Sequence, residues 1–376
     1  MADNIKKYIP ALDGFRGLAI LMVLFGHFSG EAILKQYYPV AGPVFTKIVL
    51  FGLRGVDLFF VLSGYLITSI LLGSKGKQRF FINFYSRRFL RIFPVYYASL
   101  FLIFFIMPHI FKFDEQAIEI SHRQIWLWGY MGNFPLSGFN WDTSDIFKLG
   151  HFWSLAVEQH FYLIWPFVVA RFDRHLLKTI CLSWFAVSSI AGVLDAITNF
   201  DILWLHWSSI THSGGLALGS YCAIYLYDYK KGNLCKSAMK IVYTCMPIVS
   251  LLVFVPRSFF EKIITSIMYP LTWVMFSALL IVLVTSKQES KLTRLFENKI
   301  LIKFGMYSYG IYIFHGIFRP LFEKYFPREA LISATGSPFV GISLYFFLAI
   351  SCSSAMAFVS WHAYEKHCLK LKSYFT

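Results

Sequence analysis

Arg16 and His27 stand eleven positions apart in an otherwise apolar stretch, LDGFRGLAILMVLFGHF. At about 100° per residue, eleven helical residues make close to three full turns, so both side chains lie on one face, roughly 16 Å apart along the axis. Ionisable groups in a membrane-length helix are costly and indicate function. One helix therefore offers an extended ligand both a guanidinium and an imidazole. The alternative is structural, with His27 satisfied by a neighbouring helix and Arg16 reaching to the membrane interface.

Two carboxylates are candidates to assist this pair. Asp13 precedes Arg16 by three residues, which fits an ion pair at the helix mouth or a cap of the first helix. Glu158, in HFWSLAVEQHFYLIWP, shares a helical face with Ser154 and needs a partner, for which Arg16, His27 or a substrate hydroxyl are the candidates. A carboxylate beside a histidine orients the ring and stabilises its charged form, which is how a base is held in acyl transfer.

Three arginines crowd one helical turn in YSRRFLRIFPVYY. We call Arg87, Arg88 and Arg91 the arginine triplet. Guanidinium groups bind phosphates bidentately, so the triplet is a candidate site for a polyphosphate ligand. The alternative is anchoring to anionic lipid, which basic segments beside a membrane commonly provide.

A polar stripe runs along one face of GMYSYGIYIFH, where spacings of four and three align Ser308, Tyr312 and His315. These side chains are candidates to contact a bound cofactor. A hydrogen-bond network between packed helices is the structural alternative.

The composition predicts an all-α, polytopic membrane protein. The chain has 376 residues, of which 57% are hydrophobic and only 15% charged, which is too apolar for a soluble domain. Runs of about twenty apolar residues predict about ten transmembrane helices. They fall at 12–30, 51–72, 89–108, 151–170, 179–198, 208–227, 241–256, 263–285, 304–322 and 339–362.

The formal charge of +15 does not require a nucleic-acid partner. Lys and Arg concentrate in alternate connections, which is the positive-inside pattern with both termini cytoplasmic. Outer connections instead collect acids. The first helix is expected to stay in the mature protein, since Arg16 interrupts its apolar run and no small-residue cleavage site follows.

One connection, 109–150, is much longer than the others and is expected on the outer side. Its aromatic content argues against disorder. Aromatic and acidic side chains together suit sugar rings over an outer cavity, although an interfacial aromatic belt is equally consistent. Without linkers or repeats elsewhere, 1–376 is expected to form one integral membrane domain.

Three smaller features have plainer interpretations. Asp57 lies near the outer end of the second helix, and Ser63–Gly64 in its middle indicates close packing or a kink. Glu365 suits a partner for an inner arginine. Six scattered cysteines predict neither a disulfide framework nor a zinc site, and no metal is expected.

Five stretches, taken together and in order, resemble the membrane-bound acyltransferase family 3, whose members O-acylate carbohydrates of the cell envelope. They are LDGFRGLAILMVLFGH with its Arg-x10-His spacing, GVDLFFVLSGYLI, YSRRFLRIFPVYY, HFWSLAVEQHFYLIWP and GMYSYGIYIFH. The closing WHAYEKH, which contains Glu365, resembles the family's last motif but lacks the Pro that often follows. The resemblance covers nearly the whole chain.

The resemblance implies that acyl-CoA, usually acetyl-CoA, enters from the cytoplasm and that its acyl group passes to a hydroxyl of an extracytoplasmic or lipid-linked carbohydrate. The arginine triplet would hold the coenzyme A phosphates, and the polar stripe would contact the donor. His27 and Arg16 would form the catalytic centre with Glu158 or Asp13. Such a protein lies in the bacterial cytoplasmic membrane. Some members carry a fused hydrolase-like domain, which is not expected in this chain.

A proton-coupled secondary transporter is the alternative function, because His, Glu and Arg inside a bundle also form proton relays. Inverted repeats would favour it, but the two halves show no convincing correspondence. A transporter also has no need of the arginine triplet. A lipid-binding or scaffolding protein is a third class. The acceptor sugar, the acyl length and the oligomeric state stay open at this point.

Overall fold

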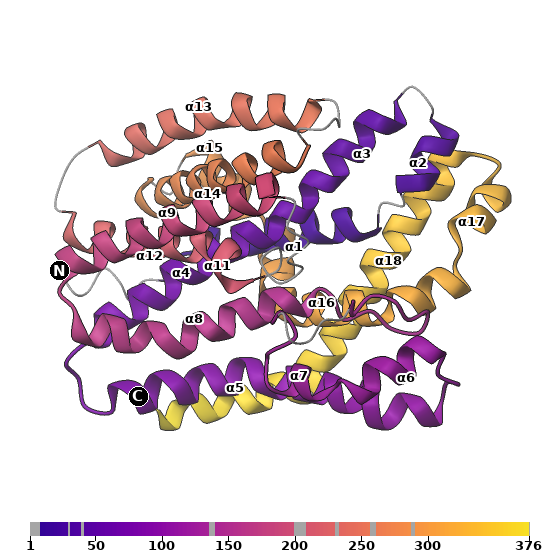
Figure 1. Ribbon diagram of the computed structural model, residues 1–376, viewed down its shortest axis with the longest axis horizontal. Helices are drawn as coiled ribbons and strands as arrows, with labels where there is room; N and C mark the ends of the chain where they lie inside the picture. Colours follow the sequence, from indigo (N-terminus) through magenta and orange to yellow (C-terminus); the bar gives the residue numbers. More distant parts are fainter. Residues whose placement is uncertain are drawn as a thin grey trace.

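The computed structural model describes residues 8–28, 31–38, 41–134, 140–198, 208–229, 233–255, 261–286 and 290–375. Within these ranges all regular structure is helical and no strand occurs. The helices lie side by side in one bundle (Figure 1). The all-α prediction is therefore confirmed.

Ten long helices build the described part of the bundle, and each overlaps one of the predicted ranges. They are α1 (Pro10–Phe28), α4 (Gly55–Ser74), α5 (Phe80–Phe101), α8 (Phe152–Arg171), α9 (Arg174–Thr198), α12 (Gly214–Asp228), α13 (Leu234–Phe254), α14 (Glu261–Thr285), α16 (Lys299–Tyr325) and α18 (Pro338–Ser360). The largest shift is in α5, which begins at Phe80 instead of 89. Its arginines lower the local hydropathy, so a search for apolar runs misses its first turns.

Shorter helices lie between the long ones, and three more follow α18. They are α2 (Glu31–Tyr37), α3 (Gly42–Phe51), η2 (Gly52–Arg54), η3 (Leu102–Ile106), η4 (Met107–His109), α6 (Glu115–His122), α7 (Ile125–Trp128), α11 (Ser209–His212), α15 (Lys291–Phe296), α17 (Arg328–Thr335), η6 (Trp361–Glu365), α19 (Lys366–Lys370) and η7 (Leu371–Tyr374). Figure 1 shows α2, α6 and α17 at one end of the bundle, which we call the loop face. The C-terminal segment lies at the opposite end, the terminal face.

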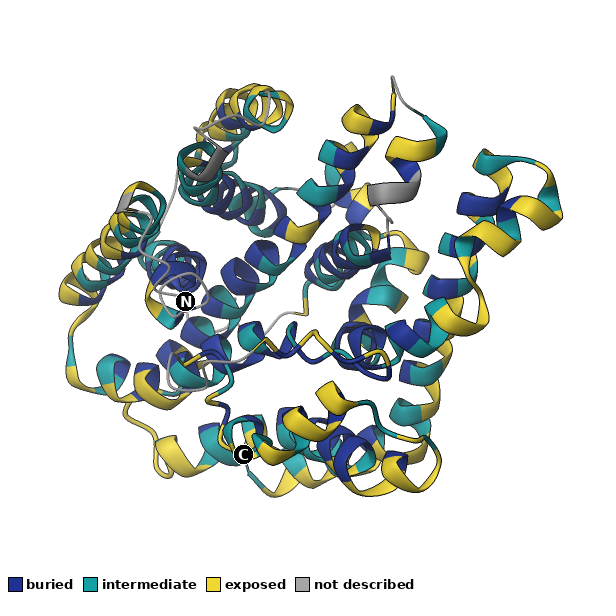
Figure 2. Ribbon diagram, turned by 45° about the vertical axis from the view of Figure 1, so that its right-hand side comes forward, coloured by how far each residue is buried: buried dark blue, intermediate teal, exposed yellow. Residues whose placement is uncertain are grey.

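Seven helical stretches of the described chain are long and apolar enough to cross a membrane, fewer than the ten that the sequence predicts. The three long helices outside this set are α8, α12 and α16. α12 has only 15 residues, and α8 and α16 carry polar side chains from the motifs described above. Large apolar side chains are exposed around the bundle, for example Leu251 at 70% and Phe347 at 67%. Figure 2 shows the buried residues inside this shell, as expected of a polytopic protein surrounded by lipid.

Helix α1 lies in the middle of the bundle and packs closely along α16. A side chain at Gly17 would collide with the carbonyl of Leu301, and one at Gly305 would collide with the carbonyl of Asp13. Small residues that allow two backbones to approach are typical of helix interfaces in membranes. This contact fixes α16 against α1 and so sets the positions of the polar residues that both helices carry.

Helix α4 packs in the same close manner on α12, which confirms the packing expected at Ser63–Gly64. A side chain at Gly64 would collide with the Leu216 carbonyl. Near its start, α4 is linked to α14 through Asp57, which pairs with Arg54 at 3.5 Å and accepts a hydrogen bond from Trp273 Nε1 at 2.8 Å. Asp57 thus has a structural role between two helices.

The long 109–150 connection folds back onto the bundle in its described part. Asp114 caps α6 by accepting from the Ala117 N–H at 2.7 Å. The Tyr96 and Tyr97 hydroxyls on α5 donate to the Leu127 and Trp128 carbonyls at 2.8 and 3.1 Å. These bonds hold α7 against α5, so this connection is a packed part of the protein.

Candidate active site

Three histidines gather near the end of α1 that points to the loop face. His27 lies in the last turn of α1, His151 directly precedes α8, and His315 is in α16. His27 Nδ1 and His315 Nε2 are 3.1 Å apart. The ring centroids of His315 and His151 are 4.9 Å apart. We call these three residues the histidine cluster.

The hydrogen bonds around His315 determine which nitrogens carry protons when the rings are neutral. His315 Nδ1 lies 2.6 Å from the Tyr312 carbonyl oxygen and 3.2 Å from that of Ile311. Carbonyls only accept, so Nδ1 carries the proton and Nε2 of a neutral His315 is an acceptor. His27 Nδ1 must then donate to it. Neutral His27 is left with a bare Nε2, the atom that a general base uses.

His151 is a member of the cluster that the sequence analysis did not single out. Its Nε2 donates to the Ile313 carbonyl of α16 at 3.2 Å. The Tyr312 hydroxyl donates to the His151 carbonyl at 3.0 Å and lies 2.6 Å from the Ser154 hydroxyl. A side chain at Gly316 would collide with the His151 ring. His151 joins the cluster through contacts with α16, which is distant in the sequence. Its position at the start of HFWSLAVEQH is the only sequence signal that could have marked it as a candidate.

The other end of α1 carries a cationic group. Arg16 pairs with Asp13 at 3.3 Å, which confirms the ion pair that the spacing suggested. The Tyr8 hydroxyl donates to Asp13 at 2.7 Å, and this bond raises the pKa of Tyr8. Arg88 and Arg91 of α5 lie close enough to Arg16 for repulsion between their charges.

The arginine triplet is divided by the structure. Arg88 and Arg91 are partly buried beside Arg16, whereas Arg87 is exposed. Lys372 of η7, which the sequence analysis did not single out, lies within electrostatic reach of all four arginines. We call Arg16, Arg88, Arg91 and Lys372 the cationic cluster. Glu365 is buried near Arg91, as expected of a partner for an inner arginine, and accepts from Ser360 at 2.9 Å.

Glu158 lies on α8 within electrostatic reach of the cationic cluster. Its carboxylate contacts the hydroxyls of Ser63 and Tyr162, which are themselves 2.5 Å apart. Arg16 and Arg88 are close enough to attract it.

Among the described residues, the structure does not bring Asp13 or Glu158 to His27, whose side-chain partner is His315. Asp13 is fourteen residues before His27 on the same helix, roughly 21 Å away along the axis. A carboxylate was expected beside His27 to orient its ring, but the side chain that contacts the ring is the imidazole of His315.

One face of α8 connects the two ends of the site. Ser154 belongs to the surroundings of the histidine cluster, and Glu158 and Tyr162 follow at intervals of one turn toward the cationic cluster. Because α8 runs from the loop face to the terminal face, this face spans the same depth as Arg16 and His27 on α1. The polar stripe of α16 is buried in the bundle, at Ser308, Tyr312 and His315 alike.

His160 has a structural role outside this face. Its Nε2 lies 3.0 Å from the Tyr130 carbonyl and its Nδ1 lies 2.8 Å from the Ser209 hydroxyl. The ring therefore connects α8 to the 109–150 connection and to α11.

Comparisons with known proteins agree with this arrangement. A family model for an acyltransferase domain, that of acyltransferase family 3, matches residues 9–358. Peptidoglycan O-acetyltransferase OatA of Listeria monocytogenes is 27% identical over 323 residues, which is 82% of this chain. O-acetyltransferase OatA of Staphylococcus aureus strain NCTC 8325 is 27% identical over 332 residues, again 82% of this chain.

The chain spans about half the length of these curated relatives, 49% and 50% respectively. No solved structure matches it.

Proposed function

Since the chain belongs to the acyltransferase 3 family, we propose that it transfers an acetyl group from cytoplasmic acetyl-CoA to a hydroxyl of an extracytoplasmic or lipid-linked carbohydrate. The observation that carries this proposal is the bare Nε2 of His27, oriented by His315 at one end of α1, with the cationic cluster at the other. The names of the OatA relatives support an acetyl group and a glycan of the cell envelope.

In this proposal the terminal face is cytoplasmic, as the distribution of Lys and Arg predicts. Arg16, Arg88, Arg91 and Lys372 bind the phosphates of coenzyme A, with the exposed Arg87 adding long-range attraction. The cluster is suited to a polyanion because its four cations lie close together, and the nearby carboxylates of Asp13, Glu158 and Glu365 offset only part of their charge. The extended pantetheine arm then follows α1, α8 and the polar stripe toward His27.

At the histidine cluster, His27 Nε2 takes the proton of the acceptor hydroxyl while the oxygen attacks the thioester carbonyl. The new C–O bond forms, the C–S bond breaks, and the imidazolium returns its proton to the departing thiolate. His315 continues to accept from His27 Nδ1 throughout, so the ring does not turn. A second route has His27 accept the acetyl group and pass it on to the hydroxyl.

The proposal is tested with purified protein and labelled acetyl-CoA, measuring acetyl transfer or release. We expect His27→Ala to lower the rate by about 10²- to 10⁴-fold, the usual contribution of a general base. His122→Ala is the matched control, because this histidine is exposed at the end of α6. A wild-type rate in the His27 variant would reject the assignment.

The acceptor is found by a separate experiment. Mass analysis of envelope glycans from cells with and without the protein should show one acetylated species that disappears with the gene. An unchanged set of acetylated glycans would contradict transfer to an envelope carbohydrate.

A further inference from the structure

Charged residues continue the polar stripe of α16 beyond the histidine cluster, toward the loop face. Arg319 follows His315 by one helical turn and Glu323 follows Arg319 by one more, so the three lie along one face of the helix. Four residues correspond to a rise of roughly 6 Å. Arg319 is accordingly within electrostatic reach of His27 and His151 as well as His315.

A network of ion pairs holds the Arg319 side chain in place. Its Nε donates to Glu323 Oε1 at 3.1 Å. Arg328, at the start of α17, donates to the same oxygen at 3.2 Å and to the Phe28 carbonyl at 3.1 Å. Phe28 directly follows His27 at the end of α1. The network therefore joins the α1 segment that carries His27 to the α16 segment that carries Arg319.

Arg319 has unused hydrogen-bond donors. Among the described residues its side chain bonds only through Nε, so Nη1 and Nη2 have no hydrogen-bond partner there. The side chain is 28% exposed, whereas that of Arg328 is 12% exposed. Two guanidiniums share the single carboxylate of Glu323, so the network has an excess positive charge. A guanidinium with two free nitrogens is suited to bind an anionic oxygen.

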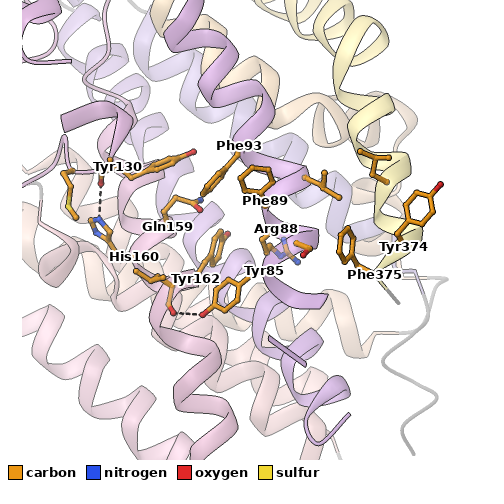
Figure 3. Close-up of a pocket in the computed structure, with 16 residues that line it drawn as sticks. Tyr85, Arg88, Phe89, Phe93, Tyr130, Gln159, His160, Tyr162, Tyr374 and Phe375 are labelled. Atoms are coloured by element: carbon orange, nitrogen blue, oxygen red, sulfur yellow. Dashed lines mark hydrogen bonds between the residues drawn. The ribbon is translucent and has the colours of Figure 1, made fainter. Parts of the chain in front are cut away.

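The cationic cluster is too far from His27 to provide this contact. Arg16 lies eleven residues before His27 on α1, roughly 16 Å away along the axis. Arg88 lines a pocket together with the C-terminal residue Phe375 (Figure 3), which places it at the terminal face. Of the arginines considered for the site, Arg319 is the one that lies beside the histidine cluster.

The proposed acetyl transfer needs a cation at this position. When the acceptor oxygen attacks the thioester, an electron pair of the C=O bond moves onto the carbonyl oxygen, and His27 becomes positively charged by taking the proton. The charges of His27 and Arg319 then repel each other unless a negative charge lies between them. The oxyanion provides that charge, and a donor that is already oriented stabilises it most. The contact is thus strongest in the transition state, as catalysis requires.

We propose that Arg319 is a catalytic residue whose terminal nitrogens donate hydrogen bonds to the thioester carbonyl oxygen as it becomes an oxyanion. Glu323 and Arg328 are positioning residues that hold Arg319 through its Nε. When the intermediate collapses, the C=O bond forms again, the C–S bond breaks, and His27 returns its proton to the departing thiolate. This inference rests on the proposed function and adds the group that stabilises its intermediate.

The test measures initial rates of acetyl transfer and release with purified protein and labelled acetyl-CoA. Arg319→Ala should lower kcat roughly 10- to 100-fold, the effect of losing a hydrogen bond to a charged group, with an unchanged KM for acetyl-CoA. Arg319→Lys keeps the charge but not the two terminal nitrogens, so its kcat should be intermediate. Lys324→Ala is the matched control, because this cation is exposed on the same helix and should keep the wild-type rate.

Chemical rescue distinguishes a catalytic role of Arg319 from a structural one. Millimolar guanidinium chloride should restore part of the rate of Arg319→Ala, whereas the same concentration of potassium chloride should not. Neither salt should restore the rate of His27→Ala. A lack of rescue together with a changed KM for acetyl-CoA would assign Arg319 a structural role and overturn the proposal.

The remaining outcomes separate this inference from the proposed function. A wild-type kcat in Arg319→Ala, with His27→Ala inactive, would overturn the role of Arg319 and leave the proposed function standing. A raised KM for the acceptor with a normal rate of acetyl release would overturn it too, and would assign Arg319 to acceptor binding. If the wild-type protein turned over no acetyl-CoA, the proposed function itself would be wrong, and this inference with it.

Discussion

The histidine cluster and the cationic cluster stand at opposite ends of one helix, α1, and they are held in opposite ways. In the histidine cluster, the rings of His151 and His315 are tied to backbone carbonyls and His27 is tied to His315. In the cationic cluster, charges of the same sign lie close together on partly exposed side chains. Fixed rings suit the making and breaking of bonds, whereas spare charge suits the binding of a polyanion. Changes at the first end should therefore alter kcat, and changes at the second should alter KM.

The largest effect expected beyond His27 itself is at His315. His315→Ala removes the acceptor for His27 Nδ1, so the ring can turn and present the wrong nitrogen. We expect kcat to fall by about 100-fold, as for a misplaced catalytic group, with an unchanged KM for acetyl-CoA. His315→Gln, which keeps an acceptor oxygen, should recover part of this loss. An equal rise in KM would mean that His315 contacts the donor, as the sequence analysis had suggested.

A smaller effect is expected in the cationic cluster, and it should change KM instead of kcat. Arg91→Ala removes a partly buried cation and should raise the KM for acetyl-CoA roughly tenfold or more, the weight of a hydrogen bond to a charged group. The matched control is Arg87→Ala from the same helix, whose exposed side chain should change KM by about twofold at most. Initial rates against acetyl-CoA concentration distinguish the two. Equal effects would contradict the division of the arginine triplet.

The smallest effect tests the support of the histidine cluster. Gly316→Ala places a methyl group against the His151 ring and should lower kcat about fivefold by displacing it. Gly73→Ala on α4 is the matched control, because nothing lies within 4 Å of a Cβ added there. If Gly316→Ala keeps the wild-type rate, His151 does not help to place the other rings.

The helices were predictable because a helix that crosses the hydrocarbon core of a membrane needs a long run of apolar residues. Each predicted range overlaps a long helix of the described chain. The prediction was least accurate where charged and polar residues enter the helices. The start of α5 was placed nine residues late because Arg87 and Arg88 belong to the helix. Likewise α8 and α16 carry too many polar residues to qualify as spans by composition.

In the candidate site, only contacts between residues of the same helix could be predicted from the sequence. The Arg16–Asp13 pair and the alignment of Tyr312 with His315 follow from helical periodicity. The partner of His27 does not, because His315 is 288 positions away in the sequence and is brought near by the packing of α16 on α1. His151 and Lys372 were missed for the same reason.

Helix α1 also sets the distance between Arg16 and His27. Arg16 and His27 are separated only by regular helical turns, so the distance between the proposed phosphate anchor and the proposed reacting nitrogen is fixed by the helix rise of about 1.5 Å per residue. Adding a single residue between them would rotate His27 by about 100° away from the face that it shares with Arg16. Adding four would restore the face but lengthen the span by about 6 Å. Under the proposed function, the number of residues between Arg16 and His27 therefore sets how far the donor arm must reach.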